Sequence, residues 1–223
     1  MDPQTAHTRL HDKLDELEHI LGPMGQRFSA AGFELALVGG SVRDALLGRP
    51  MPDLDFTTNA EPDDILALIS DWVDTHWDIG REFGTIGAVK SGVQIEITTY
   101  RAEAYEADSR KPTVRFGKDL DADLVRRDFT IGAMAIRLPG KTFVDPHDGF
   151  EDLIAGRIRT PGTAADSFSD DPLRMMRAAR FTSQLGLDPV AEVEEAMTAM
   201  ADRIEIISAE RVQVELVKLI TGI

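Results

Sequence analysis

Two short features of the sequence carry residues suited to phosphate chemistry, and they lie close together in the chain. Gly39 and Gly40 are adjacent, and Asp53 and Asp55 follow with one residue between them. A strand that ends in glycines and opens a helix leaves backbone N–H groups where an anion can approach. Two neighbouring carboxylates suit Mg²⁺, which takes phosphate oxygens as further ligands. The order and closeness of the features predict phosphoryl or nucleotidyl transfer, although each feature alone is more often a plain turn or a solvated strand edge.

The local patterns predict the elements that would hold these residues. Residues 33–40 are apolar except for Glu34 and indicate a buried strand that runs into the glycine turn. Residues 41–48 indicate a short helix that Ser41 caps and Gly48 ends. Residues 53–58 alternate like a strand, so both aspartates are expected to project from one face of a sheet.

The rest of the chain changes character near residue 160. The expected elements before that point are a helix over 8–21 that ends or kinks at Gly22-Pro23, a helix over 61–70, a hairpin over 85–100 around Ser91-Gly92, a loop over 101–122, and a strand over 129–138 with a hairpin partner in 141–149. From residue 170 onward the pattern is helical only. The sequence therefore predicts an α+β part followed by an all-α part.

Composition restricts the class of protein and the kind of site. The chain has 223 residues, no cysteine and a formal net charge of −15, so thiolate metal sites and disulfides are excluded. The N-terminus lacks the apolar core of a signal peptide, and no apolar run approaches the roughly 20 residues of a membrane span. We expect a soluble, cytoplasmic protein with no membrane partner. Because bulk charge supplies no basic face, an anionic partner must be held by a few placed arginines or by metal ions.

A second group of charged residues repeats at helical spacing. Asp171, Arg174, Arg177 and Arg180 recur every three residues, so they form a drifting stripe along roughly half of one helix. The alternative interpretation is a basic helix face that is solvated or paired with nearby acids.

Five blocks, in order, resemble one known family. They are "LVGGSVRDALLGRPMPDLDFTT" from residue 37, "DLVRRDFTIGAMAI" (123–136), "DPHDGFEDLIAGRIR" (145–159), "DDPLRMMRAARF" (170–181) and "ISAERVQVELVKLI" (207–220). They are similar to the motifs of the class II tRNA nucleotidyltransferase and bacterial poly(A) polymerase family, within the DNA polymerase β-like superfamily. The resemblance implies a nucleotidyltransferase head with a small mixed sheet and flanking helices over residues 1–160. It also implies an all-α neck over residues 161–223, with the tRNA-holding body and tail of the family absent.

The resemblance also implies roles for the first part of the chain. Asp53 and Asp55 would hold Mg²⁺ ions, and Glu96 on the neighbouring strand is our candidate third carboxylate; the alternative is a strand glutamate that points to water. Arg43 would reach the triphosphate beside the glycine turn, with Asp44 orienting it. The nucleotide-binding residues expected here are Gly39, Gly40, Ser41 and Arg43.

Further roles concern the sugar and the base. The resemblance implies that Arg126, Arg127 and Asp128 lie near the sugar and phosphates, the alternative for them being a surface Arg-Asp pair. It implies that Asp171 and Arg174 read the Watson–Crick edge of the incoming base, while Arg177 and Arg180 meet phosphate. A carboxylate accepts from the amine that cytosine and adenine share and repels the carbonyl of guanine or uracil.

The expected activity is template-independent addition of CCA to the tRNA 3′ end from CTP and ATP. The long loop over 101–124 favours full CCA addition. Poly(A) addition and a non-catalytic nucleotide-binding module remain as alternatives. Two departures bear on them: Gly132 stands where the family usually has Asn, and Asp170 where it usually has Glu.

Overall fold

The computed structural model describes residues 2–102, 115–117 and 119–222, and its contacts divide the chain into two compact units. Unit 1 comprises residues 1–124 and 134–146, and unit 2 comprises residues 125–133 and 147–223. The segment 125–133 therefore leaves unit 1 and joins unit 2 before the chain returns to the sheet. The division near residue 160, which the sequence predicts between an α+β head and an all-α neck, stays a prediction.

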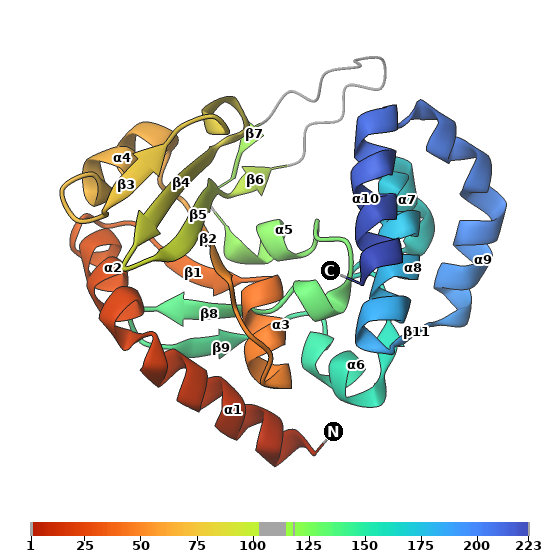
Figure 1. Cartoon of the computed structure of the whole chain (residues 1–223), viewed down its shortest axis with the longest axis horizontal. Helices are drawn as coiled ribbons and strands as arrows, with labels where there is room; N and C mark the ends of the chain where they lie inside the picture. The colour runs from red at the N-terminus through yellow and green to blue at the C-terminus, as the bar shows by residue number, and fades with distance from the viewer. Residues whose placement is uncertain (1, 103–114, 118, 223) are drawn as a thin grey trace. The chain divides into compact units, whose positions relative to one another are not determined.

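Unit 1 is built on a seven-stranded sheet (Figure 1). The mixed sheet with flanking helices that the resemblance implies is confirmed, and β3 is a strand that the sequence did not predict. Its strands are β1 (Leu35–Val38), β2 (Asp53–Thr58), β3 (Thr75–Trp77), β4 (Thr85–Lys90), β5 (Val93–Thr99), β8 (Ala135–Leu138) and β9 (Thr142–Val144). Their order is β3-β4-β5-β2-β1-β8-β9, and only the β2–β5 pair is parallel among the described strands of this sheet. The expected strand 53–58, the hairpin of β4 with β5 and the pairing of β8 with β9 are confirmed.

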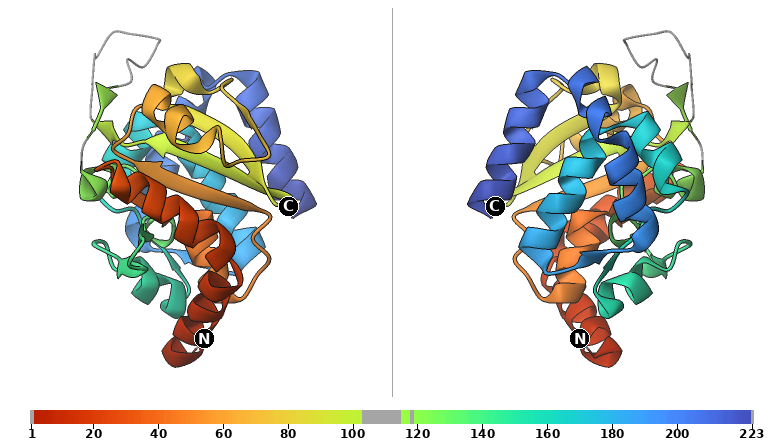
Figure 2. Two further views of the ribbon diagram at one scale, coloured as in Figure 1. Left: turned by 90° about the vertical axis from the view of Figure 1, so that its left-hand side faces the viewer. Right: turned by 90° about the vertical axis from the view of Figure 1, so that its right-hand side faces the viewer.

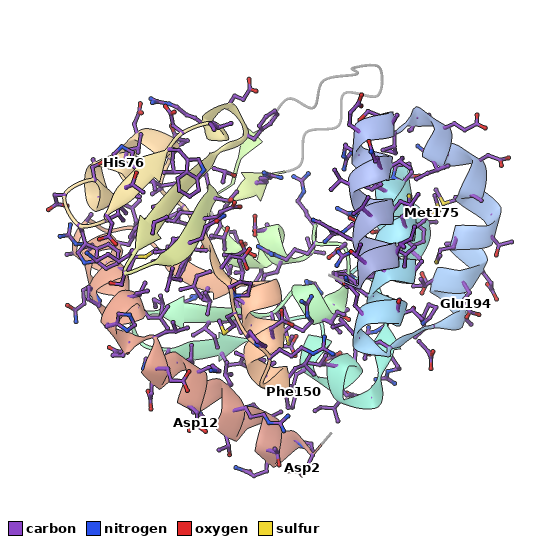
Figure 3. All side chains as sticks on the ribbon, viewed as in Figure 1. Asp2, Asp12, His76, Phe150, Met175 and Glu194 are labelled. Atoms are coloured by element: carbon purple, nitrogen blue, oxygen red, sulfur yellow. The ribbon has the colours of Figure 1, made fainter. Side chains whose placement is uncertain are left out.

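Helices flank this sheet. They are α1 (Pro3–Glu16), α2 (Glu18–Ala30), α3 (Gly40–Leu47), α4 (Pro62–Ile69), the short 3₁₀ helix η1 (Arg81–Phe83) and α5 (Leu120–Leu124). Both α2 and α4 lie on the same side of the strands (Figure 2). Gly25 allows α2 to approach β8 closely, because a Cβ at this position would lie 2.8 Å from the Cβ of Leu138. Figure 3 draws the side chains on the ribbon. Most of the buried side chains of unit 1 are apolar, and a few threonines of the sheet, Thr57, Thr58 and Thr99, are buried with them.

The first helical region differs from its prediction. The helix is interrupted at Leu17 instead of at Gly22-Pro23, and Pro23 lies inside α2. The apolar side chains of α2 continue past the proline and are completely buried, namely Ile20, Leu21, Met24 and Phe28. A proline inside a helix costs about 3 kcal/mol, whereas burial of each large apolar side chain contributes about 1.5–3 kcal/mol. Packing therefore outweighs the local cost.

Two other predictions need correction. Residues 129–138 do not form one strand: Thr130–Gly132 is the 3₁₀ helix η2, and only Ala135–Leu138 is a strand. Thr130 bonds to other residues of unit 2 instead of to a neighbouring strand: its N–H donates to the carbonyl of Arg159 and its hydroxyl donates to Asp152. The expected loop over 101–122 carries short paired strands, β6 (Arg101–Ala102) and β7 (Arg115–Phe116), and the start of α5. Most of its interior lies outside the described residues.

Unit 2 is largely helical. Its elements are η2, α6 (Gly149–Ala155), β10 (Arg157–Ile158), α7 (Ala164–Asp170), α8 (Leu173–Leu185), β11 (Asp188–Pro189), α9 (Ala191–Met200), the 3₁₀ helix η3 (Ala201–Ile206) and α10 (Ala209–Thr221). One strand interrupts the region expected to be helical only, since β11 pairs with β10 in parallel. The aromatic core includes an edge-to-face contact of Phe129 with Phe181, whose ring centroids lie 5.7 Å apart. Within the described ranges, no helix of either unit combines the length and apolarity needed to cross a bilayer.

Candidate active site

The glycine turn of unit 1 begins helix α3. Gly39 is the N-cap residue and has φ +67° and ψ −128°, a conformation that favours glycine. Its N–H donates to the carbonyl of Met134 on the way into β8. Gly40 is the first residue of α3, so the N–H groups of the first helical turn follow the end of β1 directly. Backbone N–H groups at such a helix start suit an anion, and binding of an anion here stays a prediction.

A positive side chain lies beside the same helix end. Arg43 donates from Nε and Nη2 to the two carboxylate oxygens of Asp44, both at 2.9 Å. Its Nη2 would lie 3.6 Å from a Cβ on Gly40, so the guanidinium is held near the start of α3. Asp44 thus orients Arg43 as the resemblance implies, and the Arg43 contact with a triphosphate stays a prediction.

The aspartate pair lies on β2, next to β5. Leu54 and Phe56 alternate with the aspartates and are buried, so Asp53 and Asp55 project from the opposite face of the sheet. Asp55 is the register partner of Glu96 on the parallel strand β5, which places Glu96 on the same face. Asp53 is exposed, whereas Asp55 and Glu96 are half-buried.

These donors fit a magnesium ion through the chemistry of their oxygens. Mg²⁺ is usually held by one or two carboxylates together with substrate phosphates, and not by an all-protein cage. Among the residues that the structure describes, no group of three or more His, Cys, Asp or Glu side chains is placed to hold a metal ion. The pair Asp53 and Asp55 meets the smaller requirement, and the assignment of Glu96 as a third ligand stays a prediction.

Ser41 has a different place from the one predicted. It lies inside α3 and does not cap it, because the N-cap residue is Gly39, two residues before Ser41. Its buried hydroxyl accepts from the N–H of Asp55 at 3.0 Å and donates to the carbonyl of Asp53 at 3.4 Å. Ser41 therefore fixes α3 to β2 at both aspartates. The predicted end of the helix at Gly48 is confirmed, with φ +69°.

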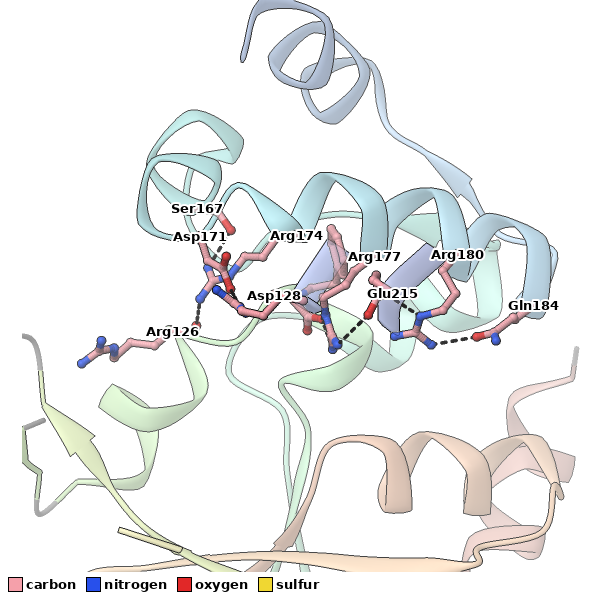
Figure 4. A network of polar contacts seen from close by, with 11 residues as sticks. Arg126, Asp128, Ser167, Asp171, Arg174, Arg177, Arg180, Gln184 and Glu215 are labelled. Carbon is pink, nitrogen blue, oxygen red and sulfur yellow. Dashed lines mark hydrogen bonds and ion pairs between the residues drawn. The ribbon is translucent and has the colours of Figure 1, made fainter. Parts of the chain in front are cut away.

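The segment 125–133 carries the next candidates into unit 2. The Arg126 side chain extends away from α8 (Figure 4), and its buried Nη1 has no hydrogen-bond partner among the described residues. Arg127 is half-buried. The Asp128 Oδ1 accepts from the N–H of Phe129, and a Cβ on Gly132 would meet only this oxygen, at 3.4 Å. The glycine therefore leaves open space beside Asp128.

Asp128 forms an ion pair with the helical stripe. Arg177 donates from Nε to its Oδ2 at 2.7 Å, and the Nη2 of Arg177 lies 2.6 Å from the same oxygen. Burial raises the pKa of Asp128, but the charge and hydrogen bond of Arg177 outweigh burial and hold the pKa below its ordinary value. Burial lowers the pKa of Arg177, but the negative charges of Asp128 and Glu215 outweigh burial. The pKa of Arg177 is therefore raised above its ordinary value. Asp128 is therefore an ionised carboxylate that Arg177 holds in place.

The stripe of charges is present on α8 and on Asp171, the C-cap residue of α7. Asp171 lies before the helix, and Arg174 donates to the hydroxyl of Ser167 at 2.8 Å and to the carbonyl of Arg126 at 2.6 Å (Figure 4). Arg180 donates from Nε to Glu215 at 2.5 Å. The alternative interpretation of pairing with nearby acids thus describes Arg177 and Arg180, and their contact with phosphate stays a prediction.

Two residues of α10 were not identified from the sequence. Glu215 is almost completely buried and accepts from Arg180, and Arg211 donates to Asp171 at 2.7 Å. A signal was present, because Val212, Glu215 and Leu219 are spaced like the inward face of a helix. An acid in the middle of such a face needs a basic partner.

The sequence matches two known families. One is described as the Poly A polymerase head domain and matches residues 35–159, and the other is described as a probable RNA- and SrmB-binding site of polymerase A and matches residues 186–222. Among curated relatives, the CCA-adding enzyme of Levilactobacillus brevis is 44% identical over 93% of this chain, and that of Staphylococcus aureus is 44% identical over 90%. The chain spans about half the length of these relatives, 53% and 49% respectively.

Solved structures show the same similarity. The Bacillus stearothermophilus CCA-adding enzyme in complex with CTP has a TM-score of 0.80 and 37% identity, covering 91% of this chain and 48% of that one. The Thermotoga maritima CCA-adding enzyme complexed with tRNA has a TM-score of 0.77 and 27% identity, covering 96% of this chain and 50% of that one.

Proposed function

Because this chain belongs to the Poly A polymerase head domain family, we propose that it catalyses template-independent addition of C and A to the 3′ end of tRNA from CTP and ATP. The observation that carries the proposal is the placement of Asp53 and Asp55 on one face of β2, joined through Ser41 to the glycine-initiated helix α3. The relatives named CCA-adding enzymes support the choice of reaction. Residues 1–160 would form the catalytic head and residues 161–223 the base-selecting neck, in a cytoplasmic protein.

In unit 1, each group has a part in nucleotidyl transfer. The first N–H groups of α3 and the guanidinium of Arg43 would bind the triphosphate. Asp53 and Asp55, with Glu96 as a third candidate, would hold Mg²⁺, which supplies charge neutralisation at the reacting phosphates when bound. The RNA 3′-hydroxyl would attack the α-phosphate in line, and pyrophosphate would leave. No side chain needs to act as a covalent nucleophile.

In unit 2, the same proposal assigns base and sugar contacts. The Asp171 carboxylate would accept from the exocyclic amine of cytosine or adenine, and Arg174 would donate to a ring nitrogen or carbonyl. Arg126, Arg127 and Asp128 would contact the sugar and phosphates, and the half-satisfied Oδ1 of Asp128 suits a ribose hydroxyl. Arg177 and Arg180 would add positive charge near the phosphates while remaining paired with acids.

Extension of a tRNA that lacks its terminal CCA tests the proposal. With CTP alone we expect two added nucleotides, and one more after ATP is added. Asp53→Ala and Asp55→Ala should lower the rate on the order of 10³-fold, since the metal stabilises the transition state by several kcal/mol. The matched control is Asp63→Ala, which removes an exposed acid of α4 in the same unit.

Other outcomes would refute the proposal in distinguishable ways. Long A tails from ATP alone would identify a poly(A) polymerase, and nucleotide binding without release of pyrophosphate would identify a non-catalytic module. Full extension by both aspartate variants would move the metal site away from β2.

A further inference from the structure

The carboxylate assigned to base reading is held by a residue that lies forty positions further along the chain. Arg211, in the first turns of α10, donates from Nη2 to the Oδ2 of Asp171 at 2.7 Å. The other oxygen of Asp171 accepts from the N–H of Leu173 at the start of α8, at 3.2 Å. Each carboxylate oxygen has two acceptor positions. Both oxygens of Asp171 are therefore oriented, and each retains an acceptor position for a ligand.

Its partner in base reading is held independently of α10. Arg174 is fixed by the hydroxyl of Ser167 in α7 and by the carbonyl of Arg126. Two of its five N–H groups are used there, so the others remain as donors. Among the described residues, Arg211 is thus the long-range support of Asp171, whereas Arg174 is supported from α7 and from the segment 125–133.

The two contacts of α10 with the stripe differ in burial. Glu215, one turn beyond Arg211, has 4% of its side chain exposed and pairs with Arg180, of which 11% is exposed. Arg211 and Asp171 have 52% and 28% exposed. Removal of one partner from a buried ion pair lowers the stability of the fold strongly, whereas removal of one partner from an exposed pair lowers it little. The Arg211–Asp171 pair is therefore expected to contribute little to the stability of the fold.

We propose that Arg211 is a positioning residue for nucleotide selection, which holds Asp171 in the orientation that accepts an exocyclic amine and repels a carbonyl. This inference rests on the proposed function. Discrimination between cytosine and uracil requires the acceptor to stay where the amine arrives, because a carboxylate free to rotate could move away from the uracil carbonyl. Arg211 supplies this restraint without contacting the base.

The test is equilibrium binding of CTP and of UTP, each with Mg²⁺, to the full chain. In Arg211→Ala we expect the ratio of CTP to UTP affinity to fall about tenfold, the loss typical of one charge-assisted hydrogen bond. Arg211→Lys should give an intermediate ratio, since lysine keeps the charge but not the planar donor fork. The matched control is Arg203→Ala, because Arg203 tethers η3 to Ser169 of α7 and does not contact Asp171. Its ratio should equal that of the wild type.

Asp171→Asn separates this inference from the proposed function. If Asp171→Asn lowers the ratio and Arg211→Ala does not, the positioning role of Arg211 is wrong while base reading by Asp171 stands. If neither variant lowers the ratio, base reading by Asp171 fails, and the inference fails with it. In the double variant we expect the ratio of Asp171→Asn alone, because Arg211 acts only through Asp171. Melting temperatures of Arg211→Ala and Arg203→Ala should agree, and a much lower value for Arg211→Ala would indicate a structural role instead.

Discussion

Unit 1 and unit 2 hold their candidate residues by different means. In unit 1 the backbone does most of the positioning: Gly39 turns the chain into α3, and the parallel register of β2 with β5 sets Asp55 beside Glu96. In unit 2 the positioning comes from ion pairs between distant segments, such as Arg177 with Asp128 and Arg180 with Glu215. One site is built from strand alternation and helix starts, and the other from charged side chains.

The difference determines how each unit should fail. A backbone-built site tolerates removal of its functional side chains, because the strand register does not depend on them. A site built from ion pairs loses stability and function together when one partner is removed, since the other charge remains in a partly desolvated place. Substitutions in the two units should therefore separate activity from stability in unit 1 and couple them in unit 2.

The largest loss of stability is expected from Asp152→Ala in unit 2. Asp152 is completely buried and accepts from Thr130, Arg157 and Arg159 at 2.7–3.0 Å. Its removal leaves the two arginines without their shared partner. It also removes the hydrogen bond from Thr130 that holds η2, the helix that follows Asp128 in the chain. We expect a loss of about 3–5 kcal/mol in the free energy of unfolding, measured by urea denaturation.

The control for Asp152 is its neighbour in α6. Glu151 is exposed and pairs with the same arginine, Arg157, at 3.1 Å. Glu151→Ala should change the free energy of unfolding far less, because exposed pairs are screened by solvent. Equal losses in the two variants would contradict the view that buried charge pairs hold unit 2.

The second prediction concerns the Asp128–Arg177 pair and its pH dependence. Asp128 has 14% of its side chain exposed and Arg177 has 34%. Asp128→Asn should lower the free energy of unfolding by about 2–3 kcal/mol at pH 7, toward the low end for paired charges because Arg177 is partly solvated. The lowered pKa of Asp128 means that its contribution is complete above the unfolded value of about 3.9 and is lost as pH falls through the folded value.

The pH profile distinguishes this pair from an ordinary surface pair. The difference between wild type and Asp128→Asn should be constant near neutral pH and shrink below about pH 4. The Arg27–Asp71 pair in unit 1 is the control, since its Asp71 is 71% exposed, and Asp71→Asn should have a much smaller effect. A difference that grows on acidification would show that Asp128 is not stabilised as a carboxylate.

How much of the molecule the sequence predicts follows the same division. The strand over 53–58, the hairpin over 85–100, the helix end at Gly48 and the stripe of α8 all follow from periodicity and glycine, which are local signals. Asp53, Asp55 and Glu96 therefore lie on one face of the sheet, as expected.

The parts that the sequence did not predict depend on contacts between distant segments. Pro23 stays in α2 because of buried side chains, and η2 replaces a strand because Thr130 bonds to Asp152 and Arg159. Arg211 and Glu215 pair with residues 40 and 35 positions away. Periodicity reports which face of a helix is buried, but it does not report which charge lies opposite.

The third prediction tests the backbone of unit 1 directly. Gly39→Ala places a side chain at φ +67° and ψ −128°, which should cost about 1–2 kcal/mol in the free energy of unfolding. It should also weaken triphosphate binding, because the start of α3 must shift to relieve the strain. The control is Gly140→Ala in the β8–β9 turn, where the nearest atom to a new Cβ is Thr142 Oγ1 at 3.6 Å and φ is not positive. Unchanged nucleotide binding in Gly39→Ala would mean that the backbone of this turn does not form the anion site.

The smallest effect on stability, Ser41→Ala, is the sharpest test of the contrast between the units. The Ser41 hydroxyl joins α3 to β2 at the backbone of Asp53 and Asp55, so its loss should cost only about 1 kcal/mol of stability. Its loss should lower the rate of nucleotide addition about 10–100-fold, the range for residues that support metal ligands. Ser70→Ala removes the exposed hydroxyl of the α4 C-cap residue, which donates to the carbonyl of Leu66 one turn earlier, and should change neither quantity. A rate loss in Ser41→Ala that is accounted for by unfolded protein would mean that unit 1, like unit 2, couples activity to stability. A rate loss in fully folded protein would show that one buried hydroxyl carries the alignment of the glycine turn with the two carboxylates.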